Sequence, residues 1–173
     1  MTDNYEEVSD NEANTFVQHT HTLLTKFIND HSNSFTEPDH TFLLRSLKVD
    51  NPFAYFYALA KVHKKQWVTR PIVSVGGSIT HGIGHWLDQQ LQPIICQLPT
   101  DLKSSFQLKT DLDQLTDVNS NHMSFFTGDI VAMYRSIDIP DALNRISHFL
   151  QTSPLAIHCP KLAIISTLEI IMT

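Results

Sequence analysis

Four basic residues gather in one short segment that contains no acidic residue. Lys61, Lys64, Lys65 and Arg70 fall within ten residues. An arginine guanidinium grips phosphate oxygens at two points, whereas a lysine ammonium acts as a compact point charge. Residues 52–75 alternate apolar and smaller side chains on both sides of these lysines, which predicts a β-hairpin that would hold the cations on a rigid support. On charge alone, phosphate binding competes with an ordinary solvated turn.

A single carboxylate interrupts an apolar segment further along the chain. Residues 123–134 are bounded by polar turns and predict a buried strand, with Asp129 near its middle. Burying an unpaired carboxylate is expensive. Two interpretations stay open: either Asp129 faces a cleft and holds a divalent cation, or it caps a neighbouring loop through hydrogen bonds. The local pattern alone favours the second.

Other arrangements that suggest chemistry are weaker. His81 and His85 have the spacing of two metal ligands on one helix face, but no glutamate at the metalloprotease spacing and no clear third ligand accompany them. The glycines between residues 76 and 84 fit neither the Walker pattern nor the dinucleotide fingerprint. A triad of Ser74, His63 and Asp88 lacks a nucleophile elbow. None of these patterns predicts a site.

Composition limits the class of protein. The chain has 173 residues, of which 42% are hydrophobic and 17% charged, as expected for one globular domain. Its net charge of -6 arises largely from an acidic stretch within residues 1–12, so the remainder is nearly neutral. Two distant cysteines form neither a disulfide framework nor a zinc motif. With no secretory signal and no uninterrupted apolar span, we expect a soluble, intracellular protein that does not enter a membrane.

Hydrophobic periodicity predicts several elements that would position the candidate residues. We expect a disordered acidic tail at residues 1–14 and an amphipathic helix at about 14–30. Further helices are predicted from their apolar stripes and their start signals. They lie around residues 42–47, after Ser78 as a cap, and from Ser104 or Ser105 to Leu115. Another has Asp138 or a nearby residue as its cap and Pro140 in its first turn, and Pro160 opens the last.

Three segments together resemble the reverse transcriptases of retroelements, particularly the Penelope-like group. They are FYALAKVHK at residues 56–64, TRPIVS at 69–74 and DIVAMY at 129–134. Their order and spacing match as well as their residues, and residues 91–93 and 103–106 are similar to that group's helical connector. The resemblance covers roughly residues 40–150.

The resemblance implies a role for each candidate residue. Arg70 would contact the triphosphate of the incoming deoxynucleotide, assisted by a lysine that is either Lys61 or Lys64. Asp129 would bind both catalytic magnesium ions, and Tyr134 would pack under the sugar and exclude a 2′-hydroxyl. Mg²⁺ is then the cofactor, and an RNA template and a DNA primer are the partners. Two metals would activate the primer hydroxyl and neutralise the leaving pyrophosphate.

The resemblance also implies the fold, which is α/β in the α+β sense. It corresponds to the partial fingers and palm of a right-hand polymerase, in which a β-hairpin and a palm strand pack with several helices. The implied organisation is a tail at 1–14 and a partial reverse transcriptase domain at 15–173, divided into fingers at 40–100, connector helices and first palm strand at 100–150, and a truncated palm helix at 155–173.

One departure from the family pattern bears on activity. The family's second metal-binding element, an aromatic residue before paired aspartates, is not found, and no aspartate follows Asp141. We therefore expect an RNA-directed DNA polymerase fragment that is inactive alone, its missing palm supplied by a continuation of the gene. The alternatives are a non-catalytic nucleotide or nucleic-acid binding module and a non-functional retroelement remnant. The family's life cycle is compatible with the nucleus, but the sequence has no convincing basic localisation run.

Overall fold

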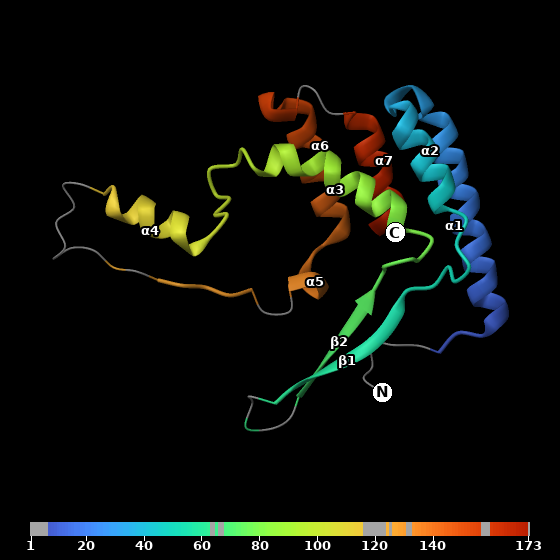
Figure 1. Cartoon of the computed structure of the whole chain (residues 1–173), viewed down its shortest axis with the longest axis horizontal. Coiled ribbons are helices and arrows are strands. Elements are labelled where there is room, and N and C mark those ends of the chain that lie inside the picture. The colour runs from blue at the N-terminus through green and yellow to red at the C-terminus, as the bar shows by residue number, and fades with distance from the viewer. Residues whose placement is uncertain are drawn as a thin grey trace.

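A computed structural model shows a mixed α+β fold, in which a body of packed helices carries a projecting β-hairpin (Figure 1). It describes residues 7–62, 65, 68–115, 124, 126–130, 133–156 and 160–172. The helices and strands in chain order are α1 (Asp10–Asp30), α2 (Glu37–Ser46), β1 (Tyr55–Lys61), β2 (Val68–Ser74), α3 (His81–Ile95), α4 (Ser105–Asp113), α5 (Met133–Ser136), α6 (Ile139–Thr152) and α7 (Lys161–Met172). Among the described helices, none has both the length and the apolar composition that a membrane span requires.

Capping side chains set where several helices begin. A capping box starts α1: the Ser9 hydroxyl accepts the Glu12 N–H, and the Glu12 carboxylate accepts the Ser9 N–H at 2.9 Å. Residues 10–14, which we expected in the disordered tail, are therefore helical. Asp138 caps α6, as predicted. Ser104, one of the two residues near which we expected a helix to begin, caps α4.

The core lies where α1, α2, α3, α6 and α7 meet. Helix α7 packs against α1, α3 and α6, and α2 packs against α1 and α3. Each helix contributes an apolar stripe, because residues three or four apart share one face. Trp86 of α3 is 1% exposed and packs edge-on against Phe35, with ring centroids 5.0 Å apart. The other most deeply buried side chains are Leu24, Ile28, Leu43, Ile83, Leu150, Ile164 and Thr167.

The predicted hairpin is confirmed. Strands β1 and β2 pair antiparallel from Tyr55 opposite Ser74 to Lys61 opposite Val68. A turn then leads into α3: Ser78 N–H donates to the Val75 carbonyl at 3.0 Å, and Gly77 has a φ of 80°, a conformation that favours glycine. The N–H of Ile79 donates to the Pro52 carbonyl, which joins the base of the hairpin to the helical body.

Two further local predictions are wrong. Residues 126–130, expected in a buried strand, form no strand and are exposed, and Met133–Ser136 is helical. A strand needs a neighbour for its N–H and C=O groups, and the sheet described in this chain holds β1 and β2 alone. Ser78 does not cap α3 either, because its hydroxyl donates to the Val75 carbonyl at 2.7 Å and Thr80 takes the cap position.

Candidate functional site

The strand register decides which hairpin side chains share a face. In an antiparallel pair, directly opposite residues lie on the same face, and faces alternate along each strand. Because Arg70 lies opposite Leu59 and Lys61 opposite Val68, both cations lie on one face. We call it the cationic face, and its members are Tyr55, Tyr57, Leu59, Lys61, Val68, Arg70, Ile72 and Ser74. The opposite face carries no charge.

Lys61 and Arg70 are diagonal neighbours on the cationic face. Such neighbours lie about 7–8 Å apart, a distance that long side chains can bridge. Arg70 is exposed and Lys61 is half-buried. The salt bridges in the described part of the chain join Lys109 to Asp113 and Arg145 to Asp141, so neither hairpin cation is neutralised by a described carboxylate. Both strands lack acidic residues, and the pair can therefore hold one polyvalent anion.

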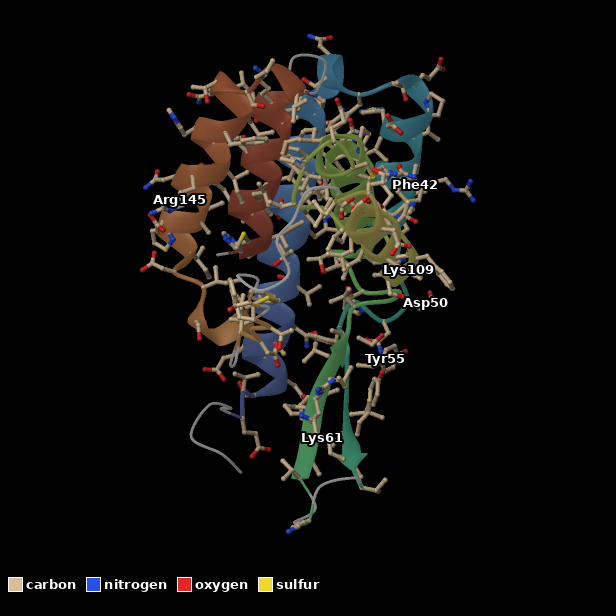
Figure 2. All side chains as sticks on the ribbon, turned by 90° about the vertical axis from the view of Figure 1, so that its left-hand side faces the viewer. Phe42, Asp50, Tyr55, Lys61, Lys109 and Arg145 are labelled. Atoms are coloured by element: carbon tan, nitrogen blue, oxygen red, sulfur yellow. The ribbon has the colours of Figure 1, made fainter. Side chains whose placement is uncertain are left out.

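Two tyrosines on the cationic face were not predicted from the sequence to be site residues. Tyr55 is 57% exposed and Tyr57 is 48% exposed, although aromatic side chains in a packed strand would be buried. The sequence spacing could have identified them. Tyr55 and Tyr57 lie an even number of positions from Lys61, and residues two apart along a strand lie on one face. Exposed aromatic rings beside cations suit stacked bases with nearby phosphates. Figure 2 labels Tyr55 and Lys61, which mark the two ends of β1.

The remaining predicted site residues are Lys64, Asp129 and Tyr134. Lys64 lies outside the described residues. Asp129 is exposed in a segment without regular structure, and no described hydrogen bond or ion pair joins it to the described part of the hairpin. Tyr134 belongs to the short helix α5. Within the described ranges, no three His, Cys, Asp or Glu side chains are grouped as metal ligands.

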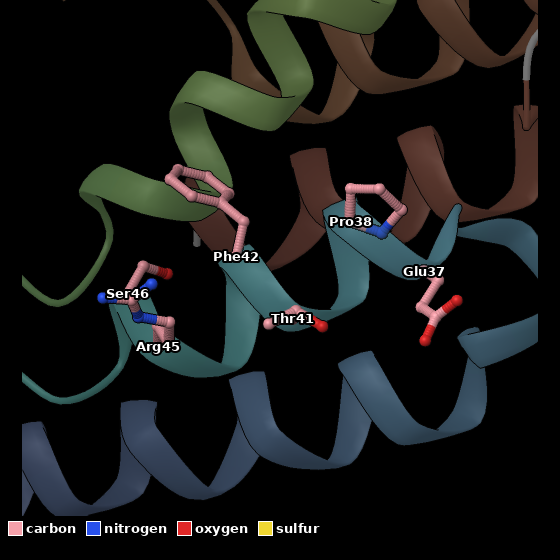
Figure 3. Close-up of a pocket in the computed structure, with 6 residues that line it drawn as sticks. All are labelled: Glu37, Pro38, Thr41, Phe42, Arg45 and Ser46. Atoms are coloured by element: carbon pink, nitrogen blue, oxygen red, sulfur yellow. The ribbon is translucent and has the colours of Figure 1, made fainter.

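A surface depression lies elsewhere, along α2. Its volume is about 650 Å³, and its lining comes from one helix alone: Glu37, Pro38, Thr41, Phe42, Arg45 and Ser46 (Figure 3). The ring of Phe42 also packs edge-on against His85, with centroids 5.9 Å apart. None of the residues expected to carry chemistry lines this depression. The hairpin is therefore the better candidate site.

Comparisons of the chain with protein-family models, with curated proteins and with solved structures find no match. The candidate site therefore rests on the residues of the hairpin and on their geometry. Its geometry is that of an exposed cationic surface with aromatic neighbours.

Proposed function

We propose that this chain is part of a reverse transcriptase domain of the retroelement type, and that its hairpin binds the triphosphate of an incoming nucleotide. The observation that carries the proposal is the placement of Arg70 and Lys61 on one accessible face of β1 and β2. That placement supports the roles that the resemblance of residues 56–64 and 69–74 implies. In this role the RNA template and the DNA primer are the partners.

The two cations have complementary tasks. The planar Arg70 guanidinium can donate two parallel hydrogen bonds to phosphate oxygens, which fixes their orientation. The Lys61 ammonium adds a compact positive charge on a flexible side chain, which can adjust to the position of a phosphate. No described carboxylate forms an ion pair with Arg70 or Lys61, so an anion can bind them without breaking one. A triphosphate, with several charged oxygens along one chain, can engage both side chains at once.

The metal chemistry is supported less well by the described residues. Two magnesium ions need several oxygen ligands, and Asp129 is a single exposed carboxylate with no grouped neighbours among the residues described. The described residues do not fit a two-metal site. We therefore confine the proposal to binding by the hairpin and assign Asp129 and Tyr134 no step in a reaction.

A second function, a non-catalytic module for single-stranded nucleic acid, is favoured by Tyr55 and Tyr57. Exposed aromatic rings stack on bases of any sequence, and neighbouring cations hold the phosphates. This function needs no metal and no further catalytic residue. It predicts binding to a polynucleotide that weakens as salt is raised, because each phosphate contact releases counterions.

Fluorescence anisotropy with a labelled deoxynucleoside triphosphate and a labelled single-stranded RNA tests both functions. Arg70→Ala should weaken triphosphate binding about tenfold to a hundredfold, since hydrogen bonds to charged groups contribute about 1.5–3 kcal/mol. Arg70→Lys should recover only part of this loss. Arg45→Ala, which removes an exposed arginine from α2, is the matched control and should bind normally.

The outcomes separate the two functions. Equal triphosphate affinity in the wild type and in a folded Arg70→Ala variant would refute triphosphate binding by the hairpin. The second function, a module for single-stranded nucleic acid, predicts a different result. The chain should bind RNA but not the triphosphate, and Tyr57→Ala should weaken the RNA complex. Circular dichroism of each variant establishes that the fold is intact.

A further inference from the structure

Tyr55 and Tyr57 are successive side chains on the cationic face of β1. The residue between them, Phe56, directs its side chain to the opposite face. Residues two apart in a strand are separated by about 6.4–6.8 Å, because a strand rises about 3.2–3.4 Å per residue. Side chains of a strand stand roughly perpendicular to the sheet. The two tyrosine rings can therefore face each other across a gap of about that width.

A gap of this width accepts one planar ring system. Stacked bases follow one another at about 3.4 Å, so a base midway between the two rings would lie at stacking distance from both. Tyr55 is 57% exposed and Tyr57 is 48% exposed, which leaves the rings accessible to a ligand from solvent. A tyrosine has only two side-chain torsions to fix, so ordering the pair around a ligand costs little conformational entropy.

We infer that Tyr55 and Tyr57 form a base slot, which sandwiches a single nucleobase and holds purines more tightly than pyrimidines. A purine has two fused rings and covers more of each tyrosine than a pyrimidine does. Because stacking recognises the face of a base, the slot leaves the hydrogen-bonding edges of the base uncovered. The inference rests on the proposed function, since Arg70 would hold the phosphates of the same nucleotide.

The distance from the base slot to the cations suits one nucleotide. Arg70 lies opposite Leu59, three positions along β1 from the middle of the slot, or about 10 Å along the strand. The long side chain of Arg70 can reach back across this distance, because Tyr57 and Arg70 are diagonal neighbours. Lys61 lies two positions further on, at the end of β1 opposite to Tyr55 (Figure 2). A triphosphate that runs from the slot toward the hairpin tip would meet Arg70 first and Lys61 next.

Proton NMR of dATP titrated with the whole chain tests the base slot. Both ring currents shield a base held between two tyrosines, so the adenine H2 and H8 signals should move upfield. Stacking on an aromatic side chain should make dATP bind about fivefold to a hundredfold more tightly than inorganic tripolyphosphate. Tyr57→Ala should remove the upfield shift and reduce dATP binding to that of tripolyphosphate. Tyr57→Phe, which keeps the ring, should restore the shift.

Two comparisons complete this experiment. Phe42→Ala removes an exposed ring from α2 and is the matched control, which should bind dATP like the wild type. The pyrimidine nucleotide dCTP should bind the wild type more weakly than dATP. Equal binding of dATP and tripolyphosphate, or dATP signals that do not move upfield, would overturn the base slot. Equal binding of dATP and dCTP would refute the preference for purines.

Adenosine distinguishes a failure of the base slot from a failure of the proposed function, because it carries no phosphate. Its upfield shifts should persist in Arg70→Ala and vanish in Tyr55→Ala. If Arg70→Ala also binds dATP like the wild type, the slot stands and triphosphate binding by Arg70 is refuted. If the adenosine shifts persist in Tyr55→Ala, the slot is refuted whatever Arg70 does.

A short oligoadenylate identifies the source of the base. It presents the same purine on a polynucleotide backbone and should displace adenosine from the slot. Tighter binding of the oligoadenylate than of dATP would make a single-stranded polynucleotide the ligand, and the reverse order would make it the free nucleotide. An oligoadenylate and a dATP that both fail to displace adenosine would contradict a slot for nucleotide bases.

Discussion

Gly82 offers the sharpest test of how the helical body is packed. It lies in the first turn of α3 and is buried against α2, where an added Cβ would overlap the Oγ and Cβ atoms of Ser46. Ser46 cannot easily move aside, because its hydroxyl donates to the Leu43 carbonyl at 2.7 Å. Gly82→Ala must therefore shift one helix against the other, and overpacking of this kind costs about 1–3 kcal/mol.

Gly84 provides the matched control for this substitution. It lies two residues further along α3, and a Cβ added there would point into open space, with no contact to another part of the fold. Both substitutions replace glycine by alanine in the same helix, so the gain in helix propensity is similar and largely cancels in the comparison. The difference in free energy of unfolding between Gly84→Ala and Gly82→Ala then measures the cost of the clash. We expect Gly84→Ala to be the more stable by about 1–3 kcal/mol.

Urea unfolding followed by tryptophan fluorescence, to which the buried Trp86 contributes, measures this difference. The double variant Gly82→Ala with Ser46→Gly should regain most of the loss, because the overlapping atoms are gone, and a double-mutant cycle isolates that coupling. If Gly82→Ala were as stable as Gly84→Ala, helices α2 and α3 would not approach as closely as the structure shows.

Two further predictions concern α1. The Ser9 hydroxyl, and to a smaller extent its backbone N–H, hydrogen-bonds the Glu12 carboxylate and lowers its pKa below the ordinary value. This hydrogen bond therefore stabilises the helix start above the unfolded-state pKa of Glu12, and the stabilisation is lost as the pH falls through the lower folded-state pKa. In Ser9→Ala, an NMR titration should find the pKa of Glu12 moved upward. An unchanged pKa would exclude the capping box. Leu24→Ala should lower the free energy of unfolding, measured in urea, by about 2–5 kcal/mol, because Leu24 is fully buried. The same substitution at its partly exposed neighbour Leu23 should lower it by less than about 1 kcal/mol. Equal losses would contradict the packing of α1.

Elements with local signals were predictable from the sequence. The alternating residues that flank Lys61 and Arg70 predict the hairpin. The serines at 104 and 105 predict the start of α4, and the cap Asp138 predicts the start of α6. Each of these signals acts within a few residues of the element it specifies. The boundary of α1 was misjudged because the acidic residues around Asp10 indicate a tail by composition, although they also favour a helix N-terminus.

Features that depend on distant partners were not predictable. The apolar residues around Asp129 have strand composition, but a strand forms only with a hydrogen-bonded neighbour, and residues 126–130 have none in the described sheet. The shared face of Lys61 and Arg70 required the register, which the pairing of Ala58 with Pro71 shows and the sequence does not. The same register was needed to recognise that Tyr57 belongs with the cations.

The most direct test of the proposed nucleotide grip is a map of the amide NMR shifts that a deoxynucleoside triphosphate causes in the ¹⁵N-labelled chain. We predict that the largest changes fall on β1 and β2, at Lys61, Val68 and Arg70, and that they vanish in Arg70→Ala. Changes centred on the α2 depression around Phe42, or the same map in the variant, would contradict a nucleotide site on the hairpin.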